Sequence, residues 1–204
     1  ELSDAEQSAW EATVLRWETI FIRAHKLQVK VMVDAEESWI QPAVDQLALR
    51  FMRAYNTTSA LVYNTAQLYR HDRLKHMKDV LELAKSEGFK YGVKIVRGAY
   101  MEKERARAQS MDYPSPIQPN KAASDRDYNA AIDLIIANMD HMAVVVGTHN
   151  QESISRVCYS LEQANIPLSD DRIHVAQLFG MSDHISFNAA ASGMNVAKYL
   201  PFGP

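Results

Sequence analysis

The stretch that decides the fold is Val93-Lys94-Ile95-Val96-Arg97-Gly98-Ala99-Tyr100, in which a short apolar run passes into a joint that contains glycine. A charged helical pattern begins directly afterwards, at Met101. A strand, a polar joint and a helix form the unit of parallel α/β sheets, whose ligands bind at the carboxyl ends of the strands. Gly98 would let the backbone approach a flat or phosphorylated ligand closely. The stretch therefore predicts a parallel sheet with a binding site at this edge.

Four other places along the chain repeat this pattern of an apolar run followed by polar or glycine residues. Their joints are Asp34-Ala35-Glu36-Glu37, Asn64-Thr65-Ala66-Gln67, Gly147-Thr148-His149-Asn150 and Gln177-Leu178-Phe179-Gly180. Short, continuously apolar runs are typical of strands that are covered on both faces. A purely structural sheet needs only turns at its strand ends, so the polar joints indicate a ligand site.

Amphipathic helical patterns alternate with these strands. We expect helices over residues 4–26, 39–55, 71–87, 101–109, 124–139, 151–164 and 182–191. We expect strands over residues 29–33, 60–63, 92–96, 143–146, 173–176 and 195–199. Pro114, Pro116 and Pro119 exclude regular structure between the fourth and fifth helices. Strands that are each joined by a helix predict a parallel α/β sheet.

The sheet is predicted to belong to a barrel rather than to an open, doubly wound fold. The sequence has neither the Gly-x-Gly-x-x-Gly fingerprint of dinucleotide-binding sheets nor a phosphate-binding Gly-x-x-x-x-Gly-Lys-Ser/Thr loop. Polar residues at every strand end are instead typical of the (β/α)8 TIM-type barrel. Because six strands do not close that barrel, we expect residues 1–204 to be a single catalytic-domain fragment, with residues 1–28 as a leading helix and residues 29–204 as a partial barrel.

Composition narrows the class of protein further. A chain of 204 residues with 47% hydrophobic content is large enough for one substantial core. The net charge of -3, with both signs interspersed, argues against a nucleic-acid-binding surface. Cys158 is the single cysteine, which excludes an intrachain disulfide and indicates a reducing compartment. No pair of histidines has metal-ligand spacing with a carboxylate partner, so we expect no metal site.

The residues of five motifs, and the order of these motifs along the chain, resemble those of a known family. The motifs are Val31-Met32-Val33-Asp34-Ala35-Glu36-Glu37, Lys94-Ile95-Val96-Arg97-Gly98-Ala99-Tyr100, Thr148-His149-Asn150, Gln177-Leu178-Phe179-Gly180-Met181 and Lys198-Tyr199-Leu200-Pro201-Phe202-Gly203-Pro204. In this series the chain resembles the proline dehydrogenases, flavin-dependent (β/α)8 barrels that oxidise L-proline. The resemblance implies that strands 29–33 to 195–199 correspond to barrel strands three to eight. Strands one and two, with a pocket lysine, and a final helix, with an arginine pair, would lie outside this chain.

The resemblance also implies a reaction and a cofactor. L-Proline would be oxidised to 1-pyrroline-5-carboxylate by hydride transfer to N5 of FAD, and the electrons would pass to a membrane quinone. The protein would then lie on the cytoplasmic or mitochondrial-matrix side of the inner membrane, in peripheral contact with it. Lys94 would face flavin N5 and Asn64 would donate to the pyrimidine edge, where many bifunctional bacterial members carry Arg and Gln. The other residues assigned to FAD are Arg97, Gly98, Ala99, Tyr100, Met101, Lys121, Thr148, His149, Asn150, Gln177 and Leu178.

Substrate contacts follow from the same resemblance. Tyr100 and Tyr199 would pack on the proline ring, Leu178 would contact its methylenes, and Asp34 would hold the hydrogen-bond network of the pocket. Side chains three residues apart on a regular strand face opposite sides of a sheet. Lys94 and Arg97 can therefore both serve the barrel interior only if Arg97 already lies in the loop.

Other interpretations of the same residues remain open. A lyase or aldolase-type barrel would use Lys94 as a Schiff-base nucleophile, activated by a cationic neighbour. The chain is alternatively a non-catalytic barrel fragment. Structural roles also exist for single residues: Asp34 as a helix N-cap, His149 as a loop or core histidine, and Tyr199 as a packing aromatic.

Overall fold

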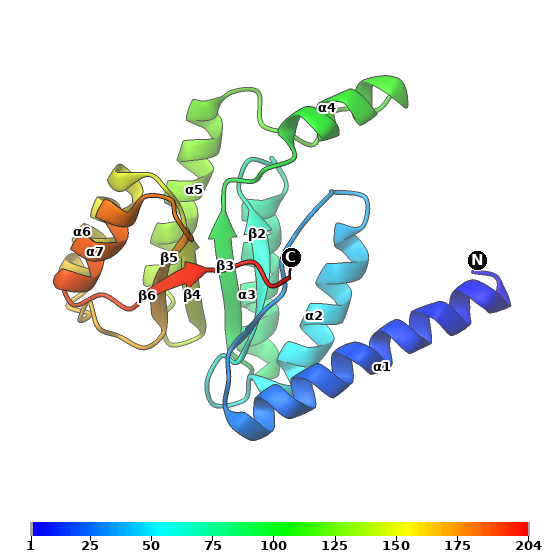
Figure 1. Ribbon diagram of the computed structural model, residues 1–204, viewed down its shortest axis with the longest axis horizontal. Helices are drawn as coiled ribbons and strands as arrows, with labels where there is room; N and C mark the ends of the chain where they lie inside the picture. The colour runs from blue at the N-terminus through cyan, green and yellow to red at the C-terminus, as the bar shows by residue number, and fades with distance from the viewer. Residues whose placement is uncertain (1, 204) are drawn as a thin grey trace.

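A single curled sheet of six parallel strands organises the computed structural model, which describes residues 2–203 (Figure 1). The strands lie in chain order and each pairs in parallel with its neighbours. The elements are α1 (Asp4–Leu27), β1 (Val31–Met32), α2 (Gln41–Tyr55), β2 (Val62–Gln67), α3 (Arg73–Glu87), β3 (Tyr91–Val96), α4 (Met101–Ser110), α5 (Lys121–Ile136), β4 (Met142–Gly147), α6 (Gln151–Gln163), β5 (Ile173–Leu178), α7 (Asp183–Ala191) and β6 (Val196–Tyr199). The predicted parallel α/β sheet is confirmed, and its form is a half-barrel.

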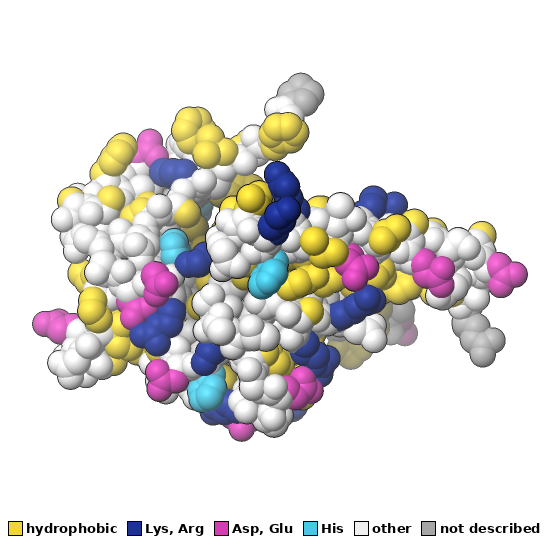
Figure 2. Space-filling model, turned by 90° about the horizontal axis from the view of Figure 1, so that it is seen from below, with side chains coloured by type: hydrophobic (Ala, Val, Ile, Leu, Met, Phe, Trp, Pro, Cys, Tyr) yellow, Lys and Arg dark blue, Asp and Glu magenta, His cyan; other side chains and the backbone are white. Residues whose placement is uncertain are grey.

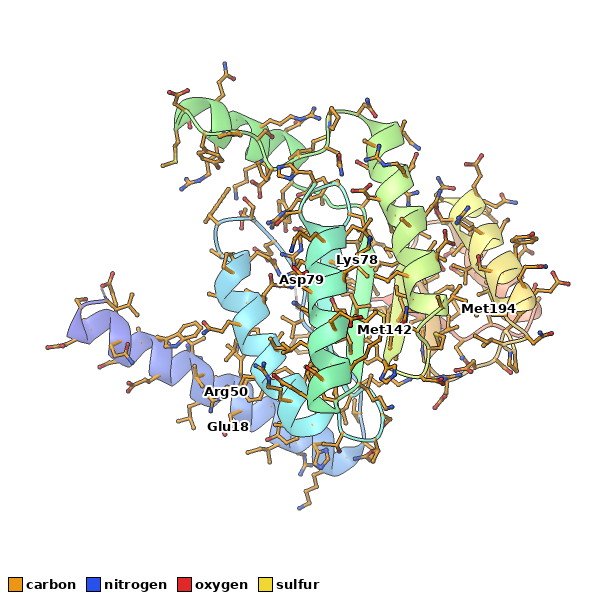
Figure 3. The ribbon with its side chains drawn as sticks, turned by 180° about the vertical axis from the view of Figure 1, so that it is seen from behind. Glu18, Arg50, Lys78, Asp79, Met142 and Met194 are labelled. Carbon is orange, nitrogen blue, oxygen red and sulfur yellow. The ribbon has the colours of Figure 1, made fainter. Side chains whose placement is uncertain are left out.

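Helices cover the outer face of the sheet, and the main core lies between the two layers. Val93 and Ile95 of β3 meet Tyr128 and Ile132 of α5 there, all of them buried. Each such side chain contributes about 1.5–3 kcal/mol when it leaves water. Seen from behind, α2, α3 and α5 lie side by side across the sheet, and Asp79 is on the solvent side of α3 (Figure 3).

The inner face of the sheet carries a second, smaller hydrophobic cluster. Tyr63, Ala143 and Val145 form a separate cluster on this face. Gly92 is necessary beside them, because a Cβ at that position would lie 2.4 Å from the carbonyl oxygen of Val62. In Figure 1 the inner face is turned toward the viewer, and β6 with the C-terminal segment passes in front of it. The inner face is therefore the concave side of the half-barrel.

Local signals set the helix boundaries. Ser3 and Glu6 form a capping box at the start of α1, and Asn150 accepts hydrogen bonds from two backbone amides at the start of α6. Gly88 ends α3 in the left-handed conformation, with a φ of 79°. These are the places at which the sequence patterns also begin and end.

Helix α1 extends from the body of the molecule as an arm. Its capped start lies far from the sheet, and side chains such as Leu15 and Ile20 are exposed along it. Seen from below, hydrophobic side chains are scattered along this arm, and charges of both signs are interspersed over the rest of the face (Figure 2). Within residues 2–203, no helix combines the length and the apolar character needed to cross a membrane.

Several boundaries differ from those predicted. Strand β2 runs over Val62–Gln67 instead of residues 60–63, and β5 continues to Leu178. Strand β1 is reduced to Val31–Met32. The polar residues of 64–67 were expected in a loop, but parallel pairing uses backbone groups, and Tyr63 to Gln67 pair in register with Gly92 to Val96. Polar composition alone therefore did not reveal where these strands end.

Candidate active site

Three of the predicted site residues meet at the carboxyl end of the half-barrel. Lys94 lies on the inner face of β3, Asp34 follows β1, and Tyr199 is the last residue of β6. The Lys94 ammonium pairs with Oδ1 of Asp34, and the Tyr199 hydroxyl donates to Oδ2 at 2.6 Å. The ammonium nitrogen also lies 5.4 Å from the centre of the Tyr199 ring. Because β1 and β6 are the two edges of the sheet, this cluster joins the edges where the sheet curls most closely.

The electrostatics of the cluster keep its phenols protonated. The hydrogen bond to Asp34 and the charge of that carboxylate raise the pKa of Tyr199. Partial burial, followed by the charges of Glu36 and Glu37, raises the pKa of Tyr100. Both side chains are therefore hydrogen-bond donors near neutral pH. Asp34 does not cap a helix, since α2 begins seven residues later with Ile40 at its N-cap.

Two side chains of β2 hold the segment that carries Asp34. The Thr65 hydroxyl donates to the carbonyl oxygen of Val33 at 2.7 Å. The Gln67 amide donates to the carbonyl oxygen of Glu36 at 2.8 Å. Gln67 is 2% exposed and was not among the predicted site residues. Strand alternation from Lys94, combined with the pairing register, is the signal that would have found it.

Asn64 lies on the opposite face of β2. Its amide donates to Oδ1 of Asp45 on α2 at 2.7 Å, and Asp45 pairs with Arg73 of α3 at 2.8 Å. Asn64 and Asp45 border a cavity of about 230 Å³ that His76 and Tyr91 also line. Burial opposes the charge of Asp45, but Arg73 and the hydrogen bonds hold the pKa of this carboxyl below its ordinary value. The structure therefore does not bring Asn64 together with Lys94.

Arg97 lies just beyond the end of β3, as the pattern required, but its guanidinium turns toward the helices. It donates to Asp125 at 2.7 Å, to Thr148 at 3.1 Å and to Ser153 at 3.0 Å. Its Cζ atom lies 4.2 Å from the centre of the buried Tyr128 ring. The group therefore ties the β3–α4 joint to α5 and α6, on the other side of the sheet from Lys94.

The joint after Arg97 rests on a buried tyrosine. Gly98 has a φ of 132°, and a Cβ there would lie 2.3 Å from the Tyr69 ring. The Tyr69 hydroxyl accepts a hydrogen bond from the Tyr100 amide at 3.3 Å, and burial raises the pKa of Tyr69 to about 12. The backbone of Gly98 and Ala99 is left exposed at the rim, followed by Met101, the first residue of α4. Gly98 thus approaches Tyr69 closely, a contact that was not predicted; its approach to a ligand stays a prediction.

A shallow groove of about 670 Å³ lies at the far end of the rim. Its lining residues are Lys121, Asn150, Gln151, Glu152 and Ser155. Asn120 and Asn150 are the N-caps of α5 and α6, so two positive helix ends flank the groove. Helix N-termini and a lysine attract anions, whereas Lys121 also pairs with Asp125 and the carboxylate of Glu152 lies in the same groove. Nδ1 of the neighbouring His149 lies 3.0 Å from the hydroxyl of Ser182, and burial and the charge of Lys198 lower the pKa of this histidine.

The end of β5 divides its predicted residues between the two faces. The Gln177 amide accepts from the Ser186 hydroxyl at 2.8 Å and donates to the Thr148 carbonyl at 3.2 Å. Leu178 pairs in register with Tyr199, and its side chain is 45% exposed. Leu178 therefore supplies an apolar surface next to the Lys94 cluster, whereas Gln177 braces the loop after β4.

Comparison with known proteins places these features in a family. A family model described as proline dehydrogenase matches residues 3–204. Human mitochondrial proline dehydrogenase 1 is 34% identical over 205 residues, which are 99% of this chain and 34% of the human protein. The carbapenem antibiotics biosynthesis protein CarD of Pectobacterium carotovorum is 39% identical over 203 residues, which are 100% of this chain and 52% of that protein. The chain therefore spans about a third to a half of the length of these relatives.

Solved structures share the fold. A crystal structure of proline utilization A from Bdellovibrio bacteriovorus superimposes with a TM-score of 0.89 at 22% identity, over 97% of this chain and 20% of that one. The curled six-stranded sheet thus matches a part of a much longer protein. Because the family model covers residues 3–204, the chain belongs to the proline dehydrogenase family.

Proposed function

We propose that the protein carrying this chain oxidises L-proline to 1-pyrroline-5-carboxylate, with FAD as hydride acceptor. The observation that carries the proposal is the cluster of Lys94, Asp34 and Tyr199 at the carboxyl rim of a chain from the proline dehydrogenase family. A small cyclic amino acid needs a polar anchor beside an apolar wall. The cluster supplies the first, and Leu178 with the face of the Tyr199 ring supplies the second.

The rim fits FAD in shape and in charge. FAD is long and carries a pyrophosphate, and the groove beside Lys121 offers a cation and two helix N-termini to such a group. Gly98 and Ala99 are exposed just after the strand that carries Lys94, and a flat ring system would lie against their backbone. When bound, FAD supplies the hydride acceptor at N5 of its ring. Lys94 would stabilise negative charge near that atom, and Thr148, His149 and Asn150 would contact the ribityl and pyrophosphate region.

The protein side chains would act mainly by orienting the substrate. Asp34 accepts from both Lys94 and Tyr199 and so fixes the positions of two donors around the pocket. The Tyr199 phenol, held protonated, would shape the pocket rather than transfer a proton. Orientation of a reacting carbon against a cofactor is itself a large contribution to catalysis.

A quinone acceptor and a peripheral membrane contact enter the proposal from the family alone. Curated relatives such as human proline dehydrogenase 1 are named as mitochondrial. We infer a location on the cytoplasmic or matrix side of the inner membrane, where a membrane quinone would reoxidise the flavin. Proline-dependent reduction of a soluble quinone analogue by the FAD-loaded protein tests this acceptor.

The Schiff-base alternative has less support. It required a cationic neighbour to activate Lys94, but the Arg97 guanidinium turns away toward Asp125. The Lys94 ammonium is bound by the Asp34 carboxylate, an arrangement suited to anchoring. Borohydride trapping of Lys94 in the presence of a carbonyl substrate would nevertheless reverse this preference.

Lys94→Met in the FAD-loaded protein tests the proposal. We expect the rate of flavin reduction by proline to fall much more than the retention of FAD, because Lys94 would act at N5 while most of the cofactor contacts lie elsewhere. Lys90→Met is the matched control, since Lys90 precedes the same strand and its ammonium contacts the Asp140 carbonyl on the surface. Equal loss of both properties in Lys94→Met, or no loss, would contradict the role at N5.

A further inference from the structure

Helix α4 carries a buried acidic residue that the proposed chemistry does not use. Glu104 is 0% exposed although α4 projects from the top of the sheet (Figure 1). Both of its carboxylate oxygens bond to one residue: Oε1 accepts from the Ser38 amide at 2.5 Å and Oε2 accepts from the Ser38 hydroxyl at 2.7 Å. Charge-assisted bonds of this kind are short and strongly directional.

Two further contacts lie on either side of this bond pair. Together they join three consecutive residues of the β1–α2 segment to one face of α4, and we name the set the α4 clasp. The α4 clasp consists of the ion pair Glu37–Lys103, the hydrogen bonds Ser38–Glu104 and the stacking of the Arg107 guanidinium on Trp39 at 4.3 Å. Of the residues that form these contacts, Glu104 is the only one with 0% exposure, so its carboxylate would be left buried and unpaired if the hydrogen bonds to Ser38 were lost.

The α4 clasp connects two predicted substrate contacts. Ser38 lies four residues after Asp34 on the same segment. Between them, the carbonyl oxygen of Glu36 accepts a hydrogen bond from the Gln67 amide. On the helix side, the Glu104 amide donates to the carbonyl oxygen of Tyr100 at 2.9 Å, in the first turn of α4. Glu104 is therefore the buried member of the α4 clasp that connects the segment bearing Asp34 with the turn bearing Tyr100.

We propose that Glu104 is a positioning residue that sets the width of the proline pocket by holding Asp34 and Tyr100 at a fixed separation. Glu104 itself touches neither pocket nor cofactor in this arrangement. The inference rests on the proposed function, since it assigns Asp34 and Tyr100 to the substrate. Its physical basis is that two hydrogen bonds to one buried carboxylate restrict the segment more than exposed ion pairs do.

The test compares Glu104→Ala, Glu104→Gln and Ser38→Ala in the FAD-loaded protein that carries this chain. Glu104→Ala should raise the KM for proline about tenfold, equivalent to about 1.4 kcal/mol, with a smaller change in kcat, because ground-state and transition-state contacts are lost together. Amide hydrogen exchange should become faster in residues 33–40 and remain unchanged in β3. Glu104→Gln keeps one acceptor oxygen and should restore most of the KM, and Ser38→Ala, which keeps the amide bond, should have an intermediate effect.

Glu102→Ala is the matched control, because Glu102 is an exposed glutamate in the same turn of α4. It should leave both the KM and the exchange unchanged. An unchanged KM and unchanged exchange in Glu104→Ala would overturn the inference, and so would equal effects of Glu102→Ala and Glu104→Ala. If Glu104→Ala does not fold, the KM for proline and the amide exchange of residues 33–40 are compared among Glu104→Gln, Ser38→Ala and the parent. Values equal to those of the parent in Ser38→Ala would then overturn the inference. A parent protein that fails to reduce flavin with proline would instead refute the proposed function.

Discussion

The two faces of the sheet differ in what their polar residues do. On the inner face, Lys94 and Gln67 reach the rim, where they contact the segment that carries Asp34. On the outer face, Asn64 is equally polar and equally well placed in the sequence, but it joins Asp45 and Arg73 beneath the helices. Strand parity therefore separates residues that contact the Asp34 segment at the rim from residues that hold the helix layer, and residue type does not.

The faces also differ in how much volume they bury. Outer-face side chains such as Val93 and Ile95 are large and fully buried, whereas the inner face alternates Gly92 and Ala143 with a few large residues. Stability should therefore respond mainly to outer-face changes, and substrate binding mainly to inner-face changes.

The strongest test of this division is Asp45→Asn on the outer face. The change leaves the Arg73 guanidinium buried, with 5% of its side chain exposed, and without its ionic partner. Loss of one member of a buried pair costs about 3–5 kcal/mol, so the free energy of unfolding in urea should fall by that amount. The KM for proline, measured on the folded fraction, should stay close to that of the parent.

Asp79→Asn is the control for that experiment, because Asp79 pairs with Lys75 on the exposed side of α3 and should change stability by less than about 0.5 kcal/mol. The pH dependence gives a second check. The folded-state pKa of Asp45 lies below its ordinary value, so its stabilisation is present above that ordinary value and is lost as the pH falls through the folded one. The parent should therefore lose more stability in acid than Asp45→Asn does; parallel acid profiles would contradict the assignment.

Gly98→Ala should have the next largest effect, at the rim where the two faces meet. The substitution combines an unfavourable positive φ with a Cβ that would lie 2.3 Å from the buried Tyr69 ring. Strain and overpacking together should cost about 3 kcal/mol, measured as a shift of the urea midpoint, and FAD retention should fall with it.

Gly88→Ala isolates the backbone part of this cost. Gly88 also has a positive φ, of 79°, but a Cβ there would meet nothing within 4 Å. It should lose only about 1 kcal/mol. Equal effects at the two glycines would mean that Tyr69 yields easily and does not fix the joint.

The sequence was sufficient for the fold because hydrophobic periodicity reports directly on burial. Alternating apolar runs and amphipathic helices located every strand and helix, and Gly88 and Asn150 marked boundaries that the structure retains. The resemblance to a family, rather than periodicity, singled out Asp34, Lys94 and Tyr199, which the structure brings into contact; their roles stay predictions.

The parts that could not be predicted depend on register and on contacts distant in sequence. Asn64 was given its cofactor contact by the resemblance and was expected in a loop after residue 63, but the strand continues through four more paired residues, and strand alternation directs Asn64 to the outer face. Tyr69 and Glu104 act through partners about 30 and 66 residues away, for which a single sequence holds no signal.

A smaller difference should distinguish Gln67 from Asn64 on the same strand: a change at Gln67 should affect mainly the KM for proline, and a change at Asn64 should affect only stability. Gln67→Met removes the donor to the Glu36 carbonyl and should raise the KM for proline several-fold, with about 1 kcal/mol of lost stability. Asn64→Ser removes the donor to Asp45 and should cost about 1–2 kcal/mol of stability with no change in KM. Steady-state kinetics give the KM for proline of both variants, and urea unfolding gives their stability. The reverse pattern would show that Asn64, not Gln67, serves the pocket.

The smallest expected effect is that of Tyr199→Phe, which tests the inner face at a single hydroxyl. The ring remains to pack on the substrate and only the hydrogen bond to Asp34 is lost, a contact worth about 1 kcal/mol at a half-exposed site. The KM for proline should therefore rise about fivefold, and hydroxyproline should be accepted better, because its hydroxyl can occupy the vacated space beside Asp34. Tyr159→Phe, at an exposed tyrosine on α6, should change neither constant. If the KM for proline and the KM for hydroxyproline are both unchanged in Tyr199→Phe, the hydrogen bond from Tyr199 to Asp34 links the two edges of the sheet without shaping the proposed proline pocket.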